Sequence, residues 1–400
     1  MRRCTRSRLV AAAPACCLAW LAIAAEAHGQ IRRDAASPDG AACRLGPATV
    51  FRYQVGATVA ARGPTQNIRL MVAVPWECPE QQVRVVEEDV AADAQISQRK
   101  LDAGEANQLL VLIPQLGGGQ KSRALLTFEV TTHVLLPPEE TGGLRVPADP
   151  PRPLKQYLGK SPYIDTDHRE IRQALDEAWK RAAEPAGPKA AEEPPESALS
   201  TEKIAPSATD DAATDDAESQ ADPPGADDAA DAAKDAASGS ADATSTEATS
   251  PETFDPLDAW ERVEAIYDYV LEHVAYLEGE DQSSVQVLRK GQGDCQAIGA
   301  LFVAMCRTAK VPARLVWVHG HQYAEFYLED AAGAGHWYPV ETAGQRAFGE
   351  MPVARVILQK GDNFRVPERR RERLRYASDY ALFLSTAGTK PSIKYVRNLQ

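Results

Sequence analysis

The sequence of 400 residues has no basic domain and no patch in which basic and aromatic residues are interleaved. Proteins that bind nucleic acids usually concentrate Lys and Arg on one face, because phosphate contacts dominate their affinity. We therefore predict that this protein does not bind nucleic acid.

Patterns for metal sites are also scarce. The aspartates of the chain form no D-x-[DN]-x-[DN]-G calcium loop. His319-x-His321-x-x-x-Glu325 has the spacing of a metal-binding strand motif like that of cupins, but no second histidine-bearing segment follows it. We predict no metal and no cofactor, and a metal site at this motif stays the minor alternative.

Large apolar residues are almost missing from residues 183–252. This stretch carries 18 acidic and 3 basic residues, so the formal charge of −13 comes mainly from here. Such a composition cannot bury enough apolar surface to offset the entropy lost on ordering. We predict a disordered acidic insertion.

Residues 1–27 have the pattern of a secretory signal peptide. Four arginines precede the apolar run Leu9–Ala25, and Ala25-Glu-Ala27 resembles a cleavage site. An uncleaved anchor is the alternative. The pattern predicts export through the Sec pathway to the periplasm or exterior of a bacterial cell.

Only four of the seven cysteines lie after this segment. In an oxidising compartment Cys43 and Cys78 are candidates for a disulfide, and two independent buried thiols are the alternative. Cys306 follows Cys295 by eleven residues, about 16 Å along a helix, which is too far for a bond. We predict that Cys306 is a small core residue.

Short stretches of alternating apolar and polar residues occupy the region from Thr49 to Leu136. Phe51, Tyr53 and Val55 alternate with polar neighbours, and Ile68–Val74 continues the pattern. Regularly spaced short strands predict an antiparallel β-sandwich. No nucleophile–base set occurs here, so we expect a domain that supports the site or presents a substrate.

Two helices of one core are predicted on either side of the acidic insertion. Asp167–Glu170 has the form of a capping box for the first helix. Asp255-Pro256 has the form of an N-cap and first-turn proline for the second. Nearer the C-terminus, Ile357–Phe364 is predicted to be extended and Tyr376–Leu384 helical.

These observations predict an α+β protein whose N-terminal antiparallel β-sandwich precedes a mixed core. The predicted divisions are a signal peptide (1–27), a loose segment (28–46), the β-sandwich (47–146), a linker with the first core helix (147–182), the disordered insertion (183–252), the core (253–345) and a C-terminal segment that wraps the core (346–400).

Cys295 begins a run with apolar residues at helical spacing. Ile298, Leu301, Phe302 and Met305 fall on one face, which predicts an amphipathic helix that ends before Val311-Pro312. At the N-terminus of a helix, unpaired amide groups and the helix dipole favour a thiolate. Asp294, directly before the thiol, is expected to cap the helix.

Three strands are predicted after this helix, at residues 314–319, 321–328 and 336–342. The midpoint between His321 and Glu341 falls in the Gly-rich turn, so an antiparallel hairpin brings these side chains together. A thiol, an imidazole and a carboxylate form the set that nucleophilic thiol catalysis requires. Spacing alone leaves His319 open as the base, since it would share a face with His321 in an unbroken strand.

Five ordered segments resemble the core of the transglutaminase-like superfamily. They are Gly293-Asp-Cys295, Leu301–Arg307, Val311-Pro-Ala-Arg314, His321–Leu328 and Trp337–Glu341. In that family a cysteine opens the central helix, a G-I-P-A-R-type turn follows, and a histidine opens an H-x-W-x-E-type strand. An aspartate closes the next strand in a W-x-x-x-D-type segment. The resemblance covers roughly residues 255–345 and implies a papain-like α+β core.

The resemblance implies a triad of Cys295, His321 and Glu341. Glutamate stands where the family usually has aspartate, so its extra methylene must be accommodated. Gln292 is assigned as an oxyanion donor by position only.

The expected function is that of an exported thiol enzyme that acts on amide bonds of proteins or peptides through a thioester, by hydrolysis or transamidation. The expected partner is a protein or peptide substrate in the cell envelope. The alternative is a catalytically inactive transglutaminase-like binding or scaffold protein of the envelope.

Overall fold

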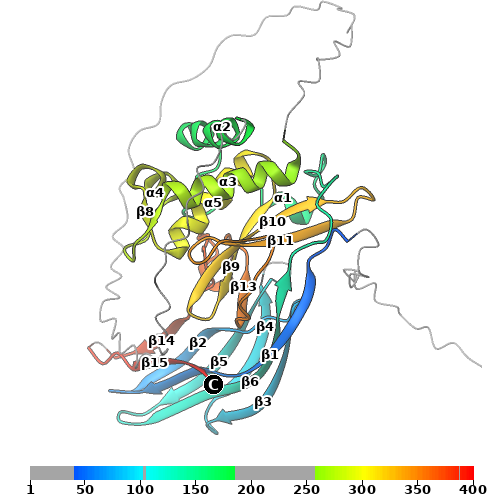
Figure 1. The fold of residues 1–400 in the computed structure, drawn as a ribbon. Helices are drawn as coiled ribbons and strands as arrows, with labels where there is room; N and C mark the ends of the chain where they lie inside the picture. The colour runs from blue at the N-terminus through cyan, green and yellow to red at the C-terminus, as the bar shows by residue number, and fades with distance from the viewer. Residues whose placement is uncertain (1–39, 102–104, 185–256, 387) are drawn as a thin grey trace, which may run out of the picture. The chain divides into compact units, whose positions relative to one another are not determined.

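The computed structural model describes residues 40–101, 105–184, 257–386 and 388–400 (Figure 1). The predicted signal peptide, residues 185–252 of the predicted acidic insertion and the Asp255-Pro256 cap lie outside these residues. The described residues belong to one compact unit of mixed helices and sheets, so the α+β prediction is confirmed.

Long antiparallel strands form the N-terminal part of the structure. They are β1 (Arg44–Ala60), β2 (Thr65–Val74), β3 (Gln81–Val90), β4 (Gln95–Leu101), β5 (Ala106–Leu116) and β6 (Lys121–Leu136). Alternate residues of β1, among them Tyr53 and Val55, face alternate residues of β2 and β5 in one apolar core. This agrees with the period of two in the sequence, because successive side chains of a strand point to opposite faces.

The last two strands of the chain complete this sandwich. β14 (Tyr380–Ser385) pairs with β2, and β15 (Ser392–Leu399) pairs with β1. The predicted helix at Tyr376–Leu384 is therefore wrong. Ala381 and Phe383 pack against the sandwich core while Leu382 and Leu384 are exposed, because the unpaired edge of β2 imposes the period of a strand.

The helices are α1 (Arg152–Lys155), α2 (Arg169–Ala183), α3 (Ala259–His273), α4 (Ser284–Lys290) and α5 (Cys295–Thr308), with a short 3-10 turn at Pro367–Arg369. None of the helices described is both long and apolar enough to cross a membrane.

The predicted cap of the first core helix differs from the observed one. His168, not Asp167, caps α2, with its Nδ1 accepting from Glu170 N at 3.3 Å, because Asp167 has a positive φ of 63°. Asp258 caps α3 in a reciprocal capping box with Glu261.

Five further strands carry the core: β9 (Ala313–Val318), β10 (His321–Glu329), β11 (Gly335–Glu341), β12 (Ala347–Phe348) and β13 (Ile357–Lys360). They continue directly into the second sheet of the sandwich, in the order β12-β11-β10-β9-β13-β5-β2-β14, with β4 on β5. A two-stranded parallel pair, β7 (Ala275–Tyr276) with β8 (Gln292–Gly293), precedes α5.

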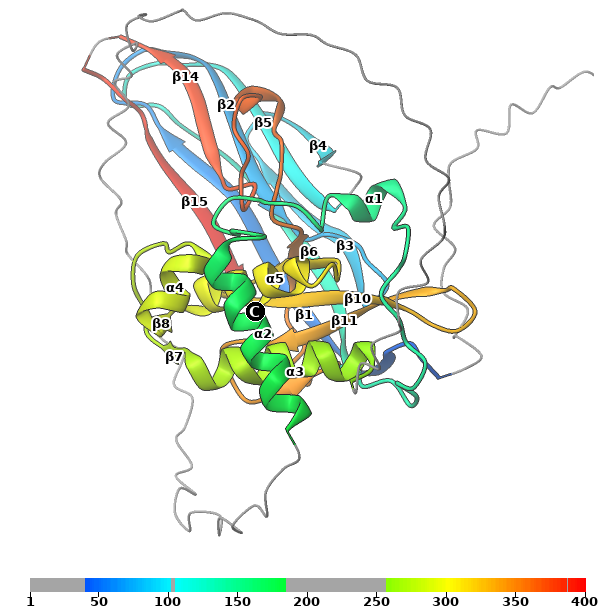
Figure 2. The same cartoon turned by 90° about the horizontal axis from the view of Figure 1, so that it is seen from above.

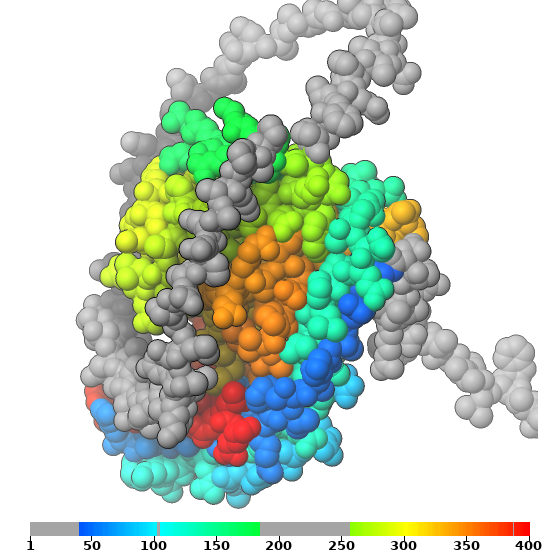
Figure 3. Space-filling model, in the orientation of Figure 1, coloured from blue at the N-terminus to red at the C-terminus, as the bar shows by residue number. Residues whose placement is uncertain are grey.

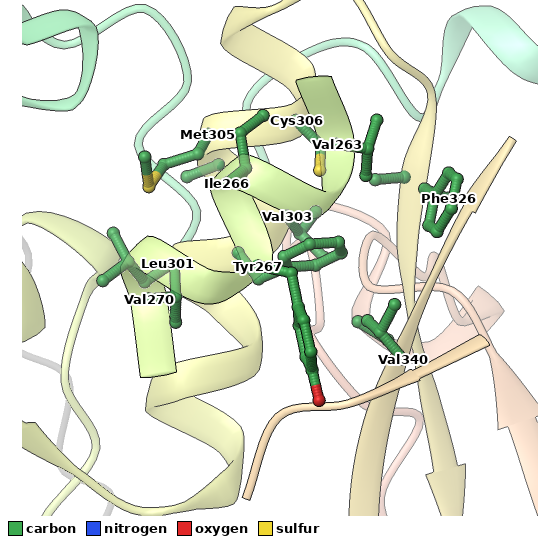
Figure 4. Close-up of a cluster of buried hydrophobic side chains, with 14 of the residues drawn as sticks. Val263, Ile266, Tyr267, Val270, Leu301, Val303, Met305, Cys306, Phe326 and Val340 are labelled. Carbon is green, nitrogen blue, oxygen red and sulfur yellow. The ribbon is translucent and has the colours of Figure 1, made fainter. Parts of the chain in front are cut away.

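Helix α5 lies at the centre of the core, against β9 and β10 on one side and against α2, α3 and α4 on the other (Figures 1 and 2). Residues 297–308 of this helix are all buried. Figure 4 shows side chains of α3 and α5 pointing toward one another and toward Phe326 and Val340 of the sheet. In Figure 3 the orange surface of the segment around β11 and β12 lies between the yellow-green helices and the blue strands.

Candidate active site

Cys295 is the first residue of α5 and is partly exposed, although residues 297–308 of the helix are buried. The preceding Asp294 caps the helix, with its Oδ1 accepting from Ala297 N at 2.8 Å, as predicted. Just before it, Gly293 pairs with Tyr276 in the β7–β8 ladder. The thiol is therefore presented at a fixed, solvent-facing helix start.

His321 begins β10 and Glu341 ends β11, and the hairpin brings their side chains together. His321 Nε2 lies 2.9 Å from Oε1 and 3.0 Å from Oε2 of Glu341. With Nε2 bonded to the carboxylate, Nδ1 is the ring nitrogen that remains for the Cys295 thiol, which lies near enough to raise the pKa of His321. The structure thus brings together all three residues singled out from the sequence.

Further contacts hold Glu341. Its Oε1 accepts from Ala343 N at 3.1 Å, and its Oε2 accepts from Arg355 Nη1 at 3.3 Å. The backbone carbonyl of Glu341 accepts from Tyr267 Oη at 2.7 Å, and Tyr267 is anchored in α3 (Figure 4). The carboxylate is fixed from three directions, which is what orienting an imidazole requires.

The charges of the pair support each other. Burial opposes the charged form of His321, but hydrogen bonds with Cys295 and Glu341 raise its pKa to about 9. Burial likewise opposes the charged form of Glu341, but the hydrogen bond and charge of His321 lower its pKa. An imidazolium–carboxylate pair beside a thiol is thus favoured around neutral pH.

Gln292 lies in β8 with an exposed side chain. No polar contact between its amide and Cys295 is recorded in the described part of the chain, so its oxyanion role stays a prediction.

Sequence reasoning missed Arg355 and Tyr267 as supports of Glu341. Tyr267 lies on the apolar face of α3, and Arg355 lies in an irregular segment without a motif. Neither carries a signal that points toward Glu341, because both contacts join segments that are distant in sequence.

The three residues of the possible metal motif, His319, His321 and Glu325, each contact a different set of side chains and do not converge on one point. His319 packs edge-to-face on Tyr53 with ring centroids 5.3 Å apart. Glu325 is buried between Lys360, at 2.7 Å, and Arg314, at 2.8 Å. Within the ranges that the structure describes, no group of three or more His, Cys, Asp or Glu residues is placed to hold a metal ion.

The other thiols are separate from the site. Cys43 and Cys78 are free and partly exposed, so the predicted disulfide between them is not formed in the structure, and Cys43 Sγ donates instead to Gly349 O at 3.3 Å. Cys306 is fully buried in α5, as predicted for a core residue.

Comparisons with known proteins agree with the motif analysis. The model of the transglutaminase-like superfamily matches residues 242–342. The crystal structure of a candidate cysteine protease from Cytophaga hutchinsonii aligns with 89% of this chain and 92% of that chain, at 13% identity and a TM-score of 0.47, which is too low to carry an argument. No curated protein matches the sequence. The chain therefore contains a domain of the transglutaminase-like superfamily, and Cys295, His321 and Glu341 all lie within it.

Proposed function

We propose that this protein is an exported thiol enzyme that acts on amide bonds of proteins or peptides through a triad of Cys295, His321 and Glu341. The observation that carries the proposal is the two-oxygen contact of Glu341 with His321 Nε2, on an imidazole whose pKa the nearby helix-terminal thiol also raises. This order of carboxylate, imidazole and thiol is that of an activated nucleophile.

In the first half of the reaction the Cys295 thiolate attacks the carbonyl carbon of the substrate amide. A C–S bond forms and the C–N bond breaks as the His321 imidazolium passes its proton to the leaving amine nitrogen. The acyl group stays on Cys295 as a thioester, and His321 is left neutral. Glu341 keeps the ring oriented throughout.

In the second half, water or a second amine attacks the thioester and gives its proton to His321. The C–S bond breaks and the thiolate–imidazolium pair returns. Water makes the protein a peptidase or amidase, and an amine makes it a transamidase.

The proposed location is the bacterial cell envelope, supported by the signal pattern of residues 1–27. Substrates of the proposed enzyme are then envelope proteins or peptides.

The test is the pH dependence of iodoacetamide alkylation at Cys295, followed by peptide mass spectrometry in wild type, His321→Ala and the control His319→Ala. We expect a rate that is already high near pH 6 in wild type and His319→Ala and that collapses in His321→Ala. A rate that rises only near pH ~8.5 in all three proteins is that of an ordinary thiol. That result would end the enzyme proposal and favour an inactive binding or scaffold protein.

Cys295→Ala provides the matching activity test. It should abolish turnover without unfolding the protein, whereas Cys43→Ser, a thiol outside the site, should retain it.

A further inference from the structure

The segment Met351–Ile357, here called the strap, links the sandwich to the candidate site. At one end Met351 forms two backbone hydrogen bonds of 2.9 Å with Leu135 of β6. At the other end the buried Gln81 of β3 holds Ile357 with both amide atoms, accepting from Ile357 N at 2.7 Å and donating to Ile357 O at 2.8 Å. The strap is thus fixed at both ends by strands of the β-sandwich.

The strap also contacts the turn that presents the histidine. His319 N donates to Val356 O at 2.9 Å, two residues before His321. Arg355, the neighbour of Val356, is thereby held beside the β10–β11 hairpin. Its side chain is 27% exposed, and its Nη1 reaches Glu341 Oε2 at 3.3 Å and Met351 Sδ at 3.8 Å.

The other ionisable side chains around Arg355 have different partners or roles. A small cavity of about 10 Å³ is lined by Arg355 together with Glu80, His133 and Tyr323. Glu80 is paired with Lys360, and His133 Nδ1 contacts Gly46 O at 2.9 Å. Glu341 is thus the carboxylate that the structure pairs with Arg355.

A guanidinium suits this position for a physical reason. In the proposed reaction His321 alternates between charged and neutral, so it cannot always compensate the Glu341 carboxylate, which is only 8% exposed. Leaving a buried charge without a partner is costly. Arg keeps its charge at any relevant pH, so it stabilises the carboxylate in both halves of the reaction.

We propose that Arg355 is a positioning residue that holds Glu341 in line with His321, and that the β-sandwich contributes to the site by anchoring the strap that carries it. The inference rests on the proposed triad. It also gives the sandwich a role in positioning the site, although the sandwich itself contains no nucleophile–base set.

The test compares Arg355→Gln with Arg355→Lys, which retains the charge, and with Val353→Ala, an exposed residue of the same strap. The readout is the titration midpoint of His321, followed by NMR of the full-length protein with labelled histidine. If Arg355 holds Glu341 in line with His321, Arg355→Gln lets the carboxylate move away, and the midpoint should fall, because the bond and charge of Glu341 raise it more than the Arg355 charge lowers it. Arg355→Lys and Val353→Ala should leave it near the wild-type value.

An unchanged or raised midpoint in Arg355→Gln, or equal shifts in the Gln and Lys variants, would overturn the inference. If Arg355→Gln does not fold, a second test follows the NMR signals of the Arg355 guanidinium protons. Glu341→Gln should change the exchange of these protons with solvent only if the two side chains interact. Failure of the triad itself gives a different result: the alkylation rate of Cys295 is then the same in the wild type and in His321→Ala.

Discussion

His321 and Glu341 are diagonal neighbours in the β10–β11 hairpin rather than a directly opposed pair. Ala324 pairs with Val340, so continuing this register places Tyr323 opposite Glu341 and His321 two residues further along. Diagonal neighbours on one face of an antiparallel pair lie roughly 7–8 Å apart, with their Cβ atoms somewhat closer. A glutamate can span this distance to the imidazole, and its two oxygens lie 2.9 and 3.0 Å from Nε2.

This geometry predicts that Glu341→Asp impairs the protein, although aspartate is the residue usual in the resembling family. The shorter side chain would withdraw the carboxylate from His321, from Ala343 N and from Arg355. We expect turnover to fall roughly 10²-fold, since a displacement of about 1 Å at a reacting group can cost that much. Steady-state rates of wild type, Glu341→Asp and Glu341→Gln check this, and an Asp variant as active as wild type would show that the side-chain length is immaterial.

The candidate triad could be predicted because its residues lie in ordered local patterns. Cys295 opens an apolar-periodic helix, and His321 and Glu341 flank one Gly-rich turn. The hairpin is centred one residue beyond the midpoint of His321 and Glu341, so the two are not directly opposed. They still meet, because glutamate is long enough to reach a diagonal partner. Arg355 could not be found this way, since its contact depends on a strap held by β3 and β6.

The fold was predicted less completely for a related reason. The sandwich strands near Tyr53 and Ile68 show their period of two locally. The pairing of β13 with both β9 and β5 joins the core and sandwich into one sheet, and only non-local hydrogen bonds specify it. The same holds for Phe383, whose strand is determined by the edge of β2.

Stability should depend on pH through His321. Its pKa is raised from 6.5 to about 9, so its charged form stabilises the native state fully below pH 6.5 and this contribution is lost as the pH rises through about 9. His321→Gln should therefore lower the melting temperature markedly at pH 6 and much less at pH 10. Thermal unfolding at both values tests this, with His319→Gln as the control, and a deficit that does not change with pH would contradict it.

Gly299 should be hard to replace, because a Cβ there would lie 2.6 Å from Gln322 Nε2 and 3.4 Å from Thr342 Oγ1. Gln322 is only 1% exposed, so its amide has little room to move. Gly299→Ala should cost about 1–3 kcal/mol through overpacking between α5 and the β10–β11 hairpin. Gln322→Ala should relieve the clash, so the double variant should be more stable than the two single changes predict. Denaturant unfolding of the four proteins checks this, and strict additivity would rule out the predicted contact.

The junction of core and sandwich should depend on Lys360. Its buried ammonium lies 2.7 Å from Glu325 Oε1 of β10 and also contacts Glu80, just before β3, and the two carboxylates outweigh burial to raise its pKa well above the usual range. Lys360→Met would leave two buried carboxylates short of a cation, which should lower the free energy of unfolding by about 3–5 kcal/mol. Lys155→Met, whose ion pair with Asp149 is exposed, should change it by less than ~1 kcal/mol. Equal, small losses in the two variants would mean that the buried pairs do not hold the junction together.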